Sequence, residues 1–257
     1  MVKKHGNFDD NYAESKRERR QKDRRNKPFL GAGGGWDPLT GYNSNKNKVH
    51  EEIQKVKPKT PNQAALLEAM AQNNLVIAEG PAGTGKTYLA ISAAVEALED
   101  GRVDRIILSR PAIEAGENLG FLPGDLQEKM APYLRPLYDA LNDRLGVRRL
   151  KQYIYDGVIE IAPIGFMRGR TLNNAFVVID EAQNCTYVQL KMLLTRLGWH
   201  STMVLTGDPG QSDLLRGMSG LYDIAVRLES VKGVAVLHMK DEDIVRHPLV
   251  AEMLNFL

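Results

Sequence analysis

Six short, mostly apolar runs alternate with segments of helical periodicity along most of the chain. The runs have the length and the Val, Ile and Leu content of buried strands. They cover residues 75–78, 105–109, 158–162, 175–179, 203–206 and 234–237. Segments with apolar residues at helical spacing lie at residues 61–70, 88–98, 125–145, 186–197 and 249–254. This alternation of strands and helices predicts an α/β domain.

Local signals mark the ends of several of these helices. Thr60 can cap the helix that starts with Pro61, because proline is well tolerated in a first helical turn. Thr186 and Gln189 have the spacing of a capping box. Pro132 and Pro136 predict interruptions of the helical segment at residues 125–145.

The first 58 residues have a different character from the rest of the chain. Residues 1–60 contain 15 Lys and Arg against 8 Asp and Glu, whereas residues 61–257 contain 19 against 24. The basic run at residues 16–27 has no apolar face, and the glycine-rich stretch Gly31–Gly35 follows it. Neither can bury enough surface to offset its ordering entropy. We therefore expect an extension at residues 1–58 and a folded domain at residues 59–257.

Two interpretations of the basic extension stay open. It can contact a nucleic-acid backbone through counterion release, which makes binding sensitive to salt and indifferent to sequence. It can equally be a solvated tail. Trp36 and Tyr42 can stack on bases, or they can dock onto the domain or onto a neighbouring subunit.

Composition limits the classes of protein to consider. Of the 257 residues 43% are hydrophobic, which is enough for a sizeable core. No apolar run approaches the roughly 18 residues of a membrane span, and the first residues lack the apolar region of a secretory signal. The single cysteine, Cys185, excludes an internal disulfide framework. We expect a cytoplasmic location and no membrane association.

A glycine-rich segment between the first apolar run and the helical segment at 88–98 carries the strongest chemical signal. It fits the phosphate-loop pattern G-x-x-x-x-G-K-[ST] with the residues Gly80, Pro81, Ala82, Gly83, Thr84, Gly85, Lys86 and Thr87. Its glycines let successive backbone N–H groups turn toward a phosphate at the start of a helix. Lys86 can reach the β- and γ-phosphates, and Thr87 can be a magnesium ligand. The flanking strand and helix argue against a plain turn.

Three further segments supply matching chemistry. Asp180 and Glu181 directly follow the apolar run at 175–179. Asp180 can hold magnesium through water, and Glu181 can accept the proton of an attacking water. Gln211 follows the run at 203–206 and can contact both a γ-phosphate and a water. Gln63, at the start of a helix, can present its amide to an adenine edge, or it can be an ordinary surface glutamine.

Taken in order, these motifs resemble the PhoH family of phosphate-starvation-associated ATPases. The segments that carry the resemblance are Asn62-Gln63, Gly80–Thr87, Ser109-Arg110-Pro111, 166–170, 177–184, 206–213 and 245–248. The resemblance covers residues 60–257. The core of this family is similar to the first motor domain of superfamily 1 helicases. The basic extension lies outside it, and no segment resembles the RNA-cutting PIN domain of some longer relatives.

The resemblance implies a RecA-like core, in which a mainly parallel sheet is flanked by helices. Gly80–Thr87 would be the Walker A motif and Asp180-Glu181 the Walker B motif, with ATP and Mg²⁺ as ligands. Gln211 would sense the γ-phosphate, and Gln63 would read adenine.

Related helicases place the nucleotide between two motor domains, and the second domain supplies arginines to the γ-phosphate. An arginine finger contributes a factor of about 10³ to 10⁵ in rate, and 257 residues accommodate one motor core. We therefore expect a homo-oligomeric ring, a hexamer, with nucleotide at the subunit interfaces. Arg246 is the first candidate for the finger. Arg168 and Arg170 are alternatives, and ordinary salt bridges are a further interpretation of these arginines.

Three functions fit these observations to different degrees. The first is an ATP-driven motor on single-stranded RNA or DNA, which the helicase-like motifs and the basic extension favour. The second is an ATPase that remodels or regulates a protein partner, with the extension as a docking tail. A small-molecule kinase is a third, and Glu181 argues against it because a kinase has no use for an activated water.

Overall fold

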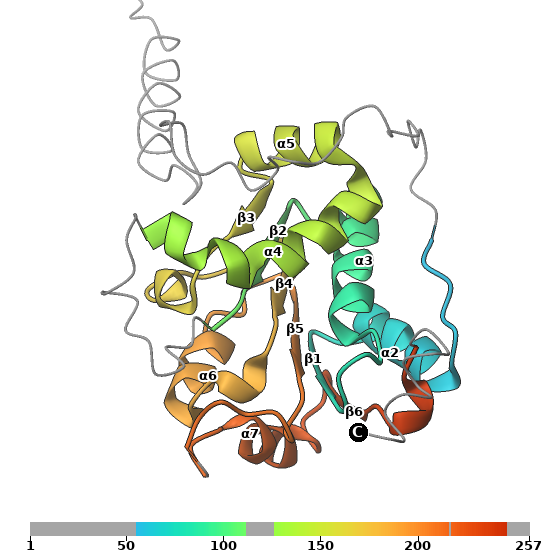
Figure 1. Cartoon of the computed structure of the whole chain (residues 1–257), viewed down its shortest axis with the longest axis vertical. Coiled ribbons are helices and arrows are strands. Elements are labelled where there is room, and N and C mark those ends of the chain that lie inside the picture. Colours follow the sequence, from blue (N-terminus) through green and yellow to red (C-terminus); the bar gives the residue numbers. More distant parts are fainter. Residues whose placement is uncertain (1–54, 112–125, 216, 246–257) are drawn as a thin grey trace, which may run out of the picture.

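The computed structural model describes residues 55–111, 126–215 and 217–245, without the side chains of residues 126–132. A single sheet crosses the molecule, and helices cover both of its faces (Figure 1). The predicted extension at residues 1–58, except its last four residues, lies outside the described residues. Residues 112–125, Arg246 and the expected helix at 249–254 lie outside them as well.

The sheet has six strands in the order β3-β2-β4-β5-β1-β6, and every registered pair is parallel. The strands are β1 (Leu75–Glu79), β2 (Arg105–Ser109), β3 (Ile159–Ile161), β4 (Ala175–Ile179), β5 (Thr202–Gly207) and β6 (Val234–His238). All six predicted strands are therefore present, and the RecA-like α/β fold with a parallel sheet is confirmed. The mostly apolar runs have a simple cause, because a parallel sheet covered on both faces needs apolar side chains at successive positions.

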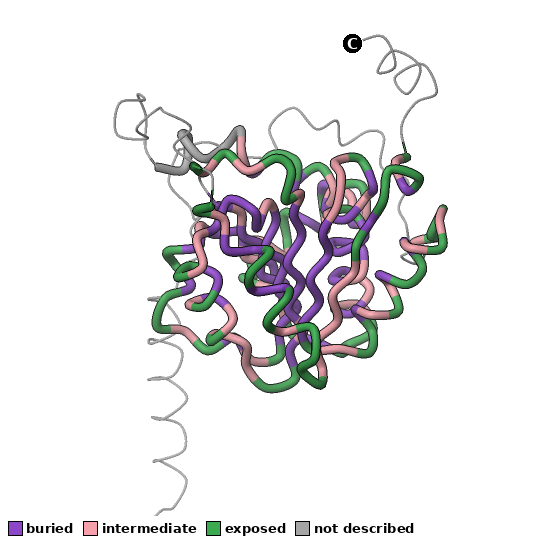
Figure 2. Tube along the Cα trace, turned by 90° about the horizontal axis from the view of Figure 1, so that it is seen from below, coloured by how far each residue is buried: buried purple, intermediate pink, exposed green. Residues whose placement is uncertain are grey.

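Two apolar clusters lie on opposite faces of the sheet, and successive residues of one strand alternate between them. Val76 and Ala78 of β1 belong to the first cluster, whereas Leu75 and Ile77 belong to the second. Figure 2 shows the buried chain concentrated in the middle of the molecule. The helices that contribute to the first cluster are α2 (Pro61–Gln72), α3 (Lys86–Glu99), α4 (Leu126–Leu145) and α5 (Val147–Tyr155). The second includes residues of α6 (Tyr187–Leu194) and α7 (Leu221–Leu228).

The predicted helix starts are confirmed. The Thr60 side chain accepts a hydrogen bond from the backbone N–H of Gln63 at the start of α2. Thr186 and Gln189 form a reciprocal capping box on α6, which ends three residues before the predicted limit. The short helices α5 and α7 were not anticipated.

The expectation that Pro132 and Pro136 interrupt the helix at residues 125–145 is wrong, because α4 runs without a break from Leu126 to Leu145. Pro136 lies on the exposed side of the helix. The opposite side packs fully buried residues, including Leu134, Leu137, Tyr138 and Leu141, into the first cluster. Burial of one such side chain contributes about 1.5–3 kcal/mol, so the packing of this face offsets the cost of the prolines. Among the described residues, none of the helices has the length and hydropathy to cross a membrane.

Gly80 occupies a position that no other residue fits. Its φ is +139°, and a Cβ at this residue would lie 2.3 Å from the backbone oxygen of Met239. The backbone N–H of Met239 donates to the carbonyl of Glu79 at 2.7 Å. The segment after β6 is thus packed directly on the residue that opens the phosphate loop.

We predict that Gly80→Ala lowers the free energy of unfolding by about 1–3 kcal/mol, the usual cost of overpacking, with added backbone strain at a positive φ. Denaturant titration of both proteins measures this difference. The matched control is Gly165→Ala, because a Cβ there meets no atom within 4 Å. Equal stability losses in the two variants would contradict the prediction.

Candidate functional site

The predicted motifs meet at one edge of the sheet, at the carboxyl ends of the strands. The phosphate loop follows β1, Asp180 and Glu181 follow β4, and Asp208 and Gln211 follow β5. Because β4, β5 and β1 are neighbours in the sheet, their carboxyl ends form one crevice of the kind that binds ligands in open α/β sheets. The resulting cleft has a volume of about 270 Å³, and residues of all three segments line it.

The phosphate loop bends through glycines in the left-handed region. Gly83 has φ +86° and Gly85 has φ +83°. Gly85 is the N-cap residue of α3, and it makes no side-chain cap hydrogen bond. The first backbone N–H groups of α3 are therefore not used by a capping side chain, and they lie at the positive end of the helix dipole. This arrangement can bind a phosphate.

Lys86 folds back over the loop. Its Nζ donates to the carbonyl oxygens of Gly80 at 2.6 Å and Pro81 at 2.7 Å, and to Thr84 Oγ1 at 3.3 Å. Burial lowers the pKa of the Lys86 ammonium, and the nearby carboxylates, Asp208 foremost, oppose this shift. An anionic ligand in the cleft would offer the ammonium group a stronger partner than these neutral carbonyls.

Asp180 is buried and accepts two short hydrogen bonds on one oxygen. Thr87 Oγ1 donates to Asp180 Oδ1 at 2.6 Å, and Thr206 Oγ1 donates to the same atom at 2.8 Å. Hydroxyl and carboxylate oxygens are ligands that Mg²⁺ accepts, and Mg²⁺ usually takes its other ligands from water and substrate phosphates. Thr87 and Asp180 therefore fit a magnesium site next to the phosphate loop.

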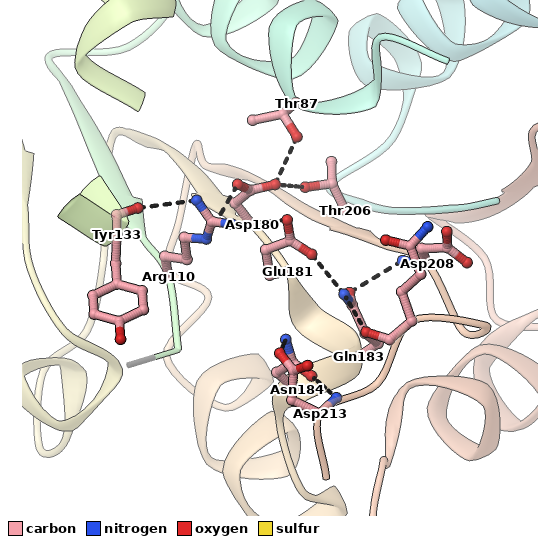
Figure 3. A network of polar contacts seen from close by, with 11 residues as sticks. Thr87, Arg110, Tyr133, Asp180, Glu181, Gln183, Asn184, Thr206, Asp208 and Asp213 are labelled. Carbon is pink, nitrogen blue, oxygen red and sulfur yellow. Dashed lines mark hydrogen bonds and ion pairs between the residues drawn. The ribbon is translucent and has the colours of Figure 1, made fainter. Parts of the chain in front are cut away.

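Glu181 has both carboxylate oxygens engaged. Arg110 Nη2 donates to Oε1 at 2.9 Å, and Gln183 Nε2 donates to Oε2 at 2.5 Å. Figure 3 shows this carboxylate between the Asp180 side chain and Gln183. Glu181 also has a φ of +53°, an uncommon value for a residue other than glycine. Such backbone conformations concentrate at functional sites.

Gln183 and Asp208 connect the three segments of the site. Gln183 Oε1 accepts from the Asp208 backbone N–H at 3.1 Å, and Gln183 Nε2 also lies 3.4 Å from the carbonyl of Gln211. Asp208 Oδ2 accepts from the backbone N–H of Ala82 at 3.2 Å. A displacement of the phosphate loop can thus be transmitted through Asp208 and Gln183 to Glu181.

Most of the predicted site residues come together in the cleft. It is lined by Ala82, Gly83, Gly85, Lys86, Thr87, Asp180, Glu181 and Gln211, together with Tyr88, Gly207 and Asp208. Gln63 is not among its lining residues. It is buried, so it is not an ordinary surface glutamine. Its Nε2 donates to the Thr84 carbonyl at 3.0 Å, and its Oε1 accepts from the Lys59 N–H at 2.8 Å.

The described arginine candidates lie away from the cleft. Arg168 is exposed at the end of a short helix after β3. Arg170 makes a paired contact with Glu160 at 2.6 and 2.7 Å. Hydrogen bonding to Glu160 raises the pKa of Arg170, so the salt-bridge interpretation fits this residue. Arg246 lies outside the described residues.

Sequence reasoning assigned no role to four polar residues that the structure places around the two carboxylates. They are Arg110, Gln183, Thr206 and Asp208. Each lies at the end of an apolar strand or within a few residues after it. That position was a usable signal, but only the strand order shows which of these residues meet.

The fold and the site together define a P-loop nucleoside triphosphatase. Residues 55–257 match the PhoH family, described as "PhoH-like protein", and the chain belongs to this family.

The chain is 53% identical over 217 residues to a PhoH-like protein of Bacillus subtilis, covering 82% of this chain and 68% of that one. It is 47% identical over 192 residues to Protein PhoH of Escherichia coli K12, covering 74% of this chain and 54% of that protein. The chain therefore spans only about half to two thirds of the length of these relatives.

The solved structures that match the chain are more distant in sequence. A large terminase from a thermophilic bacteriophage is 14% identical with a TM-score of 0.49, and the match covers 77% of this chain and 49% of that chain. The Pif1 helicase from Candida albicans is 14% identical with a TM-score of 0.40, over 78% of this chain and 44% of that chain.

Glu79 is a buried acid directly before the phosphate loop. Burial raises its pKa, and His238 opposes the shift. The His238 Nδ1 atom lies 3.4 Å from Glu79 Oε2, whereas Oε1 has no hydrogen-bond partner among the described residues. A raised carboxyl pKa means that the folded state favours the protonated form, so stability is lost as pH rises through the folded-state pKa.

We predict that Glu79→Gln raises the melting temperature at pH 7 to 8 by a few degrees, and that the gain shrinks as pH falls below the ordinary carboxyl range. Melting curves across pH measure this. The control Glu242→Gln, at an exposed carboxylate paired with Lys240 at 3.8 Å, should show no such trend. A gain that grows toward acid pH would refute the prediction.

Proposed function

We propose that this protein binds ATP with Mg²⁺, hydrolyses it, and acts as a ring-forming motor on single-stranded RNA or DNA. The observation that carries the ATPase proposal is the convergence of Lys86, Thr87, Asp180, Glu181 and Gln211 around one cleft. These residue types, in this arrangement, match the requirements of phosphoryl transfer to water.

Each residue has a defined role in this proposal. The N–H groups of residues 83–87 hold the phosphates, and Lys86 leaves its carbonyl partners to bind the β- and γ-phosphates. Thr87 and Asp180 hold Mg²⁺, which would neutralise charge on the phosphates. Glu181 accepts the proton of the attacking water, and Gln211 orients that water and senses the γ-phosphate.

Gln63 keeps its proposed role as the adenine reader. Its hydrogen bond to the Thr84 carbonyl places the amide against the phosphate loop. Beyond this bond and the one from Lys59, the amide keeps one Nε2 hydrogen and one Oε1 lone pair for an adenine edge. Gln63 would then connect recognition of the base to the position of the loop.

The nucleic-acid part of the proposal rests on charge and on family resemblance. Residues 1–60 carry a net excess of basic side chains, with 15 Lys and Arg against 8 Asp and Glu. Such an extension binds phosphodiester backbones through counterion release. The alternative, an ATPase that acts on a protein partner, predicts hydrolysis that ignores nucleic acid.

We predict that single-stranded RNA or DNA stimulates ATP hydrolysis and that the stimulation fades as salt rises, because counterion release weakens with salt. Steady-state ATPase assays over a salt series measure this. Deletion of residues 1–58 should reduce the stimulation and leave the basal rate of ATP hydrolysis unchanged. Full basal activity without stimulation at any salt concentration would favour the protein-partner alternative.

The same assay tests the general base. Glu181→Gln should lower kcat by about 10²-fold or more, the usual contribution of a general base, and should still bind nucleotide. The control is Glu68→Gln, an exposed carboxylate on α2, which should hydrolyse ATP at the normal rate. Normal activity of Glu181→Gln would exclude its role as the base.

An exposed apolar surface supports the ring. It consists of Val188 on α6, Tyr222 and Val226 on α7, and Leu215 and Met218 before α7, which are 52–81% exposed. We call it the α6–α7 surface. Chain continuity links it to the nucleotide cleft, because Gln211 lines the cleft and Leu215 follows four residues later. A subunit that covers this surface would come close to the γ-phosphate side of the cleft and could supply Arg246 as the finger.

We predict that Tyr222→Glu weakens self-association, because loss of a buried interface aromatic costs about 2 kcal/mol or more and a charge would be desolvated. Sedimentation velocity over a concentration series with ATP measures the shift toward monomer. Tyr155→Glu is the matched control, since Tyr155 is 81% exposed on α5, away from the α6–α7 surface. Identical sedimentation of Tyr222→Glu and the unmodified chain would exclude this surface from the ring.

A further inference from the structure

The carboxylate proposed as general base is restrained by a neighbouring strand. Arg110 directly follows β2, and its Nη2 donates to Glu181 Oε1 at 2.9 Å. Gln183 occupies the other oxygen at 2.5 Å. Each oxygen keeps a second lone pair, but the two bonds fix the orientation of the carboxylate and take one acceptor position on each oxygen. They therefore restrain the carboxylate when it has to orient and deprotonate a water.

Arg110 is itself held firmly. Its Nη1 donates to the Tyr133 carbonyl at 3.0 Å, and its Nε lies 3.9 Å from Asp180 Oδ2. The Asp180 N–H donates to the Ser109 carbonyl at 2.9 Å, so the ends of β2 and β4 are joined. Figure 3 shows the guanidinium between Asp180 and the Tyr133 backbone. Arg110 therefore extends from the end of β2 to both carboxylates that follow β4, those of Asp180 and Glu181.

A second pocket adjoins the nucleotide cleft on the Arg110 side. Its volume is about 480 Å³, and Glu181 and Gln211 line both spaces. Arg110, Tyr133, Asn184 and Asp213 line only the second. The Arg110 side chain is 21% exposed, so an occupant of this pocket can reach the guanidinium without unfolding the site.

The polar groups of this pocket suit a nucleotide strand better than a simple anion. A phosphodiester oxygen can accept from Arg110. The Asp213 carboxylate and the Asn184 amide, which are hydrogen-bonded to each other at 3.3 Å, can accept from and donate to a base edge or a sugar hydroxyl. A carboxylate so close would repel an isolated phosphate, whereas a nucleotide offers it donors.

We propose that Arg110 is a positioning residue that restrains Glu181, and that single-stranded nucleic acid in the adjoining pocket draws Arg110 away and frees the carboxylate to activate water. The choice of nucleic acid as the occupant of the pocket depends on the proposed function. The restraint itself rests only on the contacts of Arg110. Binding of nucleic acid would thereby switch on hydrolysis through one side chain shared by the two sites.

The test compares ATPase kinetics of Arg110→Met with those of the unmodified full chain, with and without single-stranded RNA. Methionine keeps the length of the stem but removes every donor. We expect basal kcat to rise about tenfold, the effect of removing 1.4 kcal/mol of restraint. The KM for ATP should stay unchanged, and the stimulated-to-basal ratio should fall toward one. Arg110→Lys keeps the charge and one donor site, and it should restore part of the restraint.

Arg149→Met is the matched control, because it removes an ion pair with Glu99 between α5 and α3 that does not contact the site. It should keep the basal rate and the stimulation of the unmodified chain, and melting curves of the two methionine variants show whether both fold. A basal kcat of Arg110→Met equal to or below that of the unmodified chain would overturn the restraint. A raised basal rate with full remaining stimulation would overturn the release by nucleic acid. An unmodified chain that RNA and DNA leave unstimulated would refute the motor function, and the basal rates would still decide the restraint.

Discussion

The rest of the site depends on the contacts that stabilise the buried carboxylate of Asp180. A charge removed from water is stable only when it is hydrogen-bonded and paired. Asp180 meets this requirement with the hydroxyls of Thr87 and Thr206 and with Arg110 nearby. These partners come from α3, β5 and the end of β2. One carboxylate therefore fixes the start of the helix after the phosphate loop relative to three neighbouring strands.

This constraint explains how the site combines rigidity with the capacity to change. Asp180 sits at the end of β4 with its backbone bonded to Ser109. The next residue, Glu181, leaves the strand with a positive φ and projects toward groups that can exchange partners. Lys86 and Glu181 both form hydrogen bonds with groups of their own chain. In the proposed reaction, phosphate oxygens and the attacking water would bind at the same positions. Proposed binding and catalysis would then proceed by exchange of hydrogen bonds at the carboxyl ends of the strands.

The relation between the cleft and the α6–α7 surface follows from the topology. The segment after β5 carries Asp208 and Gln211 along the cleft and continues into α7. Its first half is tied to the site through Gln183, whereas its second half presents Leu215 and Met218 to solvent. The proposed subunit contact on α7 and the proposed γ-phosphate contact at Gln211 would thus act on the same short stretch of chain.

The sequence by itself determined the six strands, the glycine-rich loop after β1 and the position of two carboxylates directly after β4, because these depend on local patterns of apolar runs, glycines and caps. It also placed Gln211 at a strand end near them. It misjudged α4, where burial of one helix face outweighs two prolines, and it missed the partners of Glu181. Arg110 and Gln183 are ordinary polar residues in the chain, 71 and 2 positions from Glu181. Only the tertiary structure decided that they share its carboxylate. Arg110 reaches it because long-range pairing, which no local pattern encodes, makes β2 and β4 neighbours. Gln183 reaches it where the chain turns at Glu181 with a positive φ.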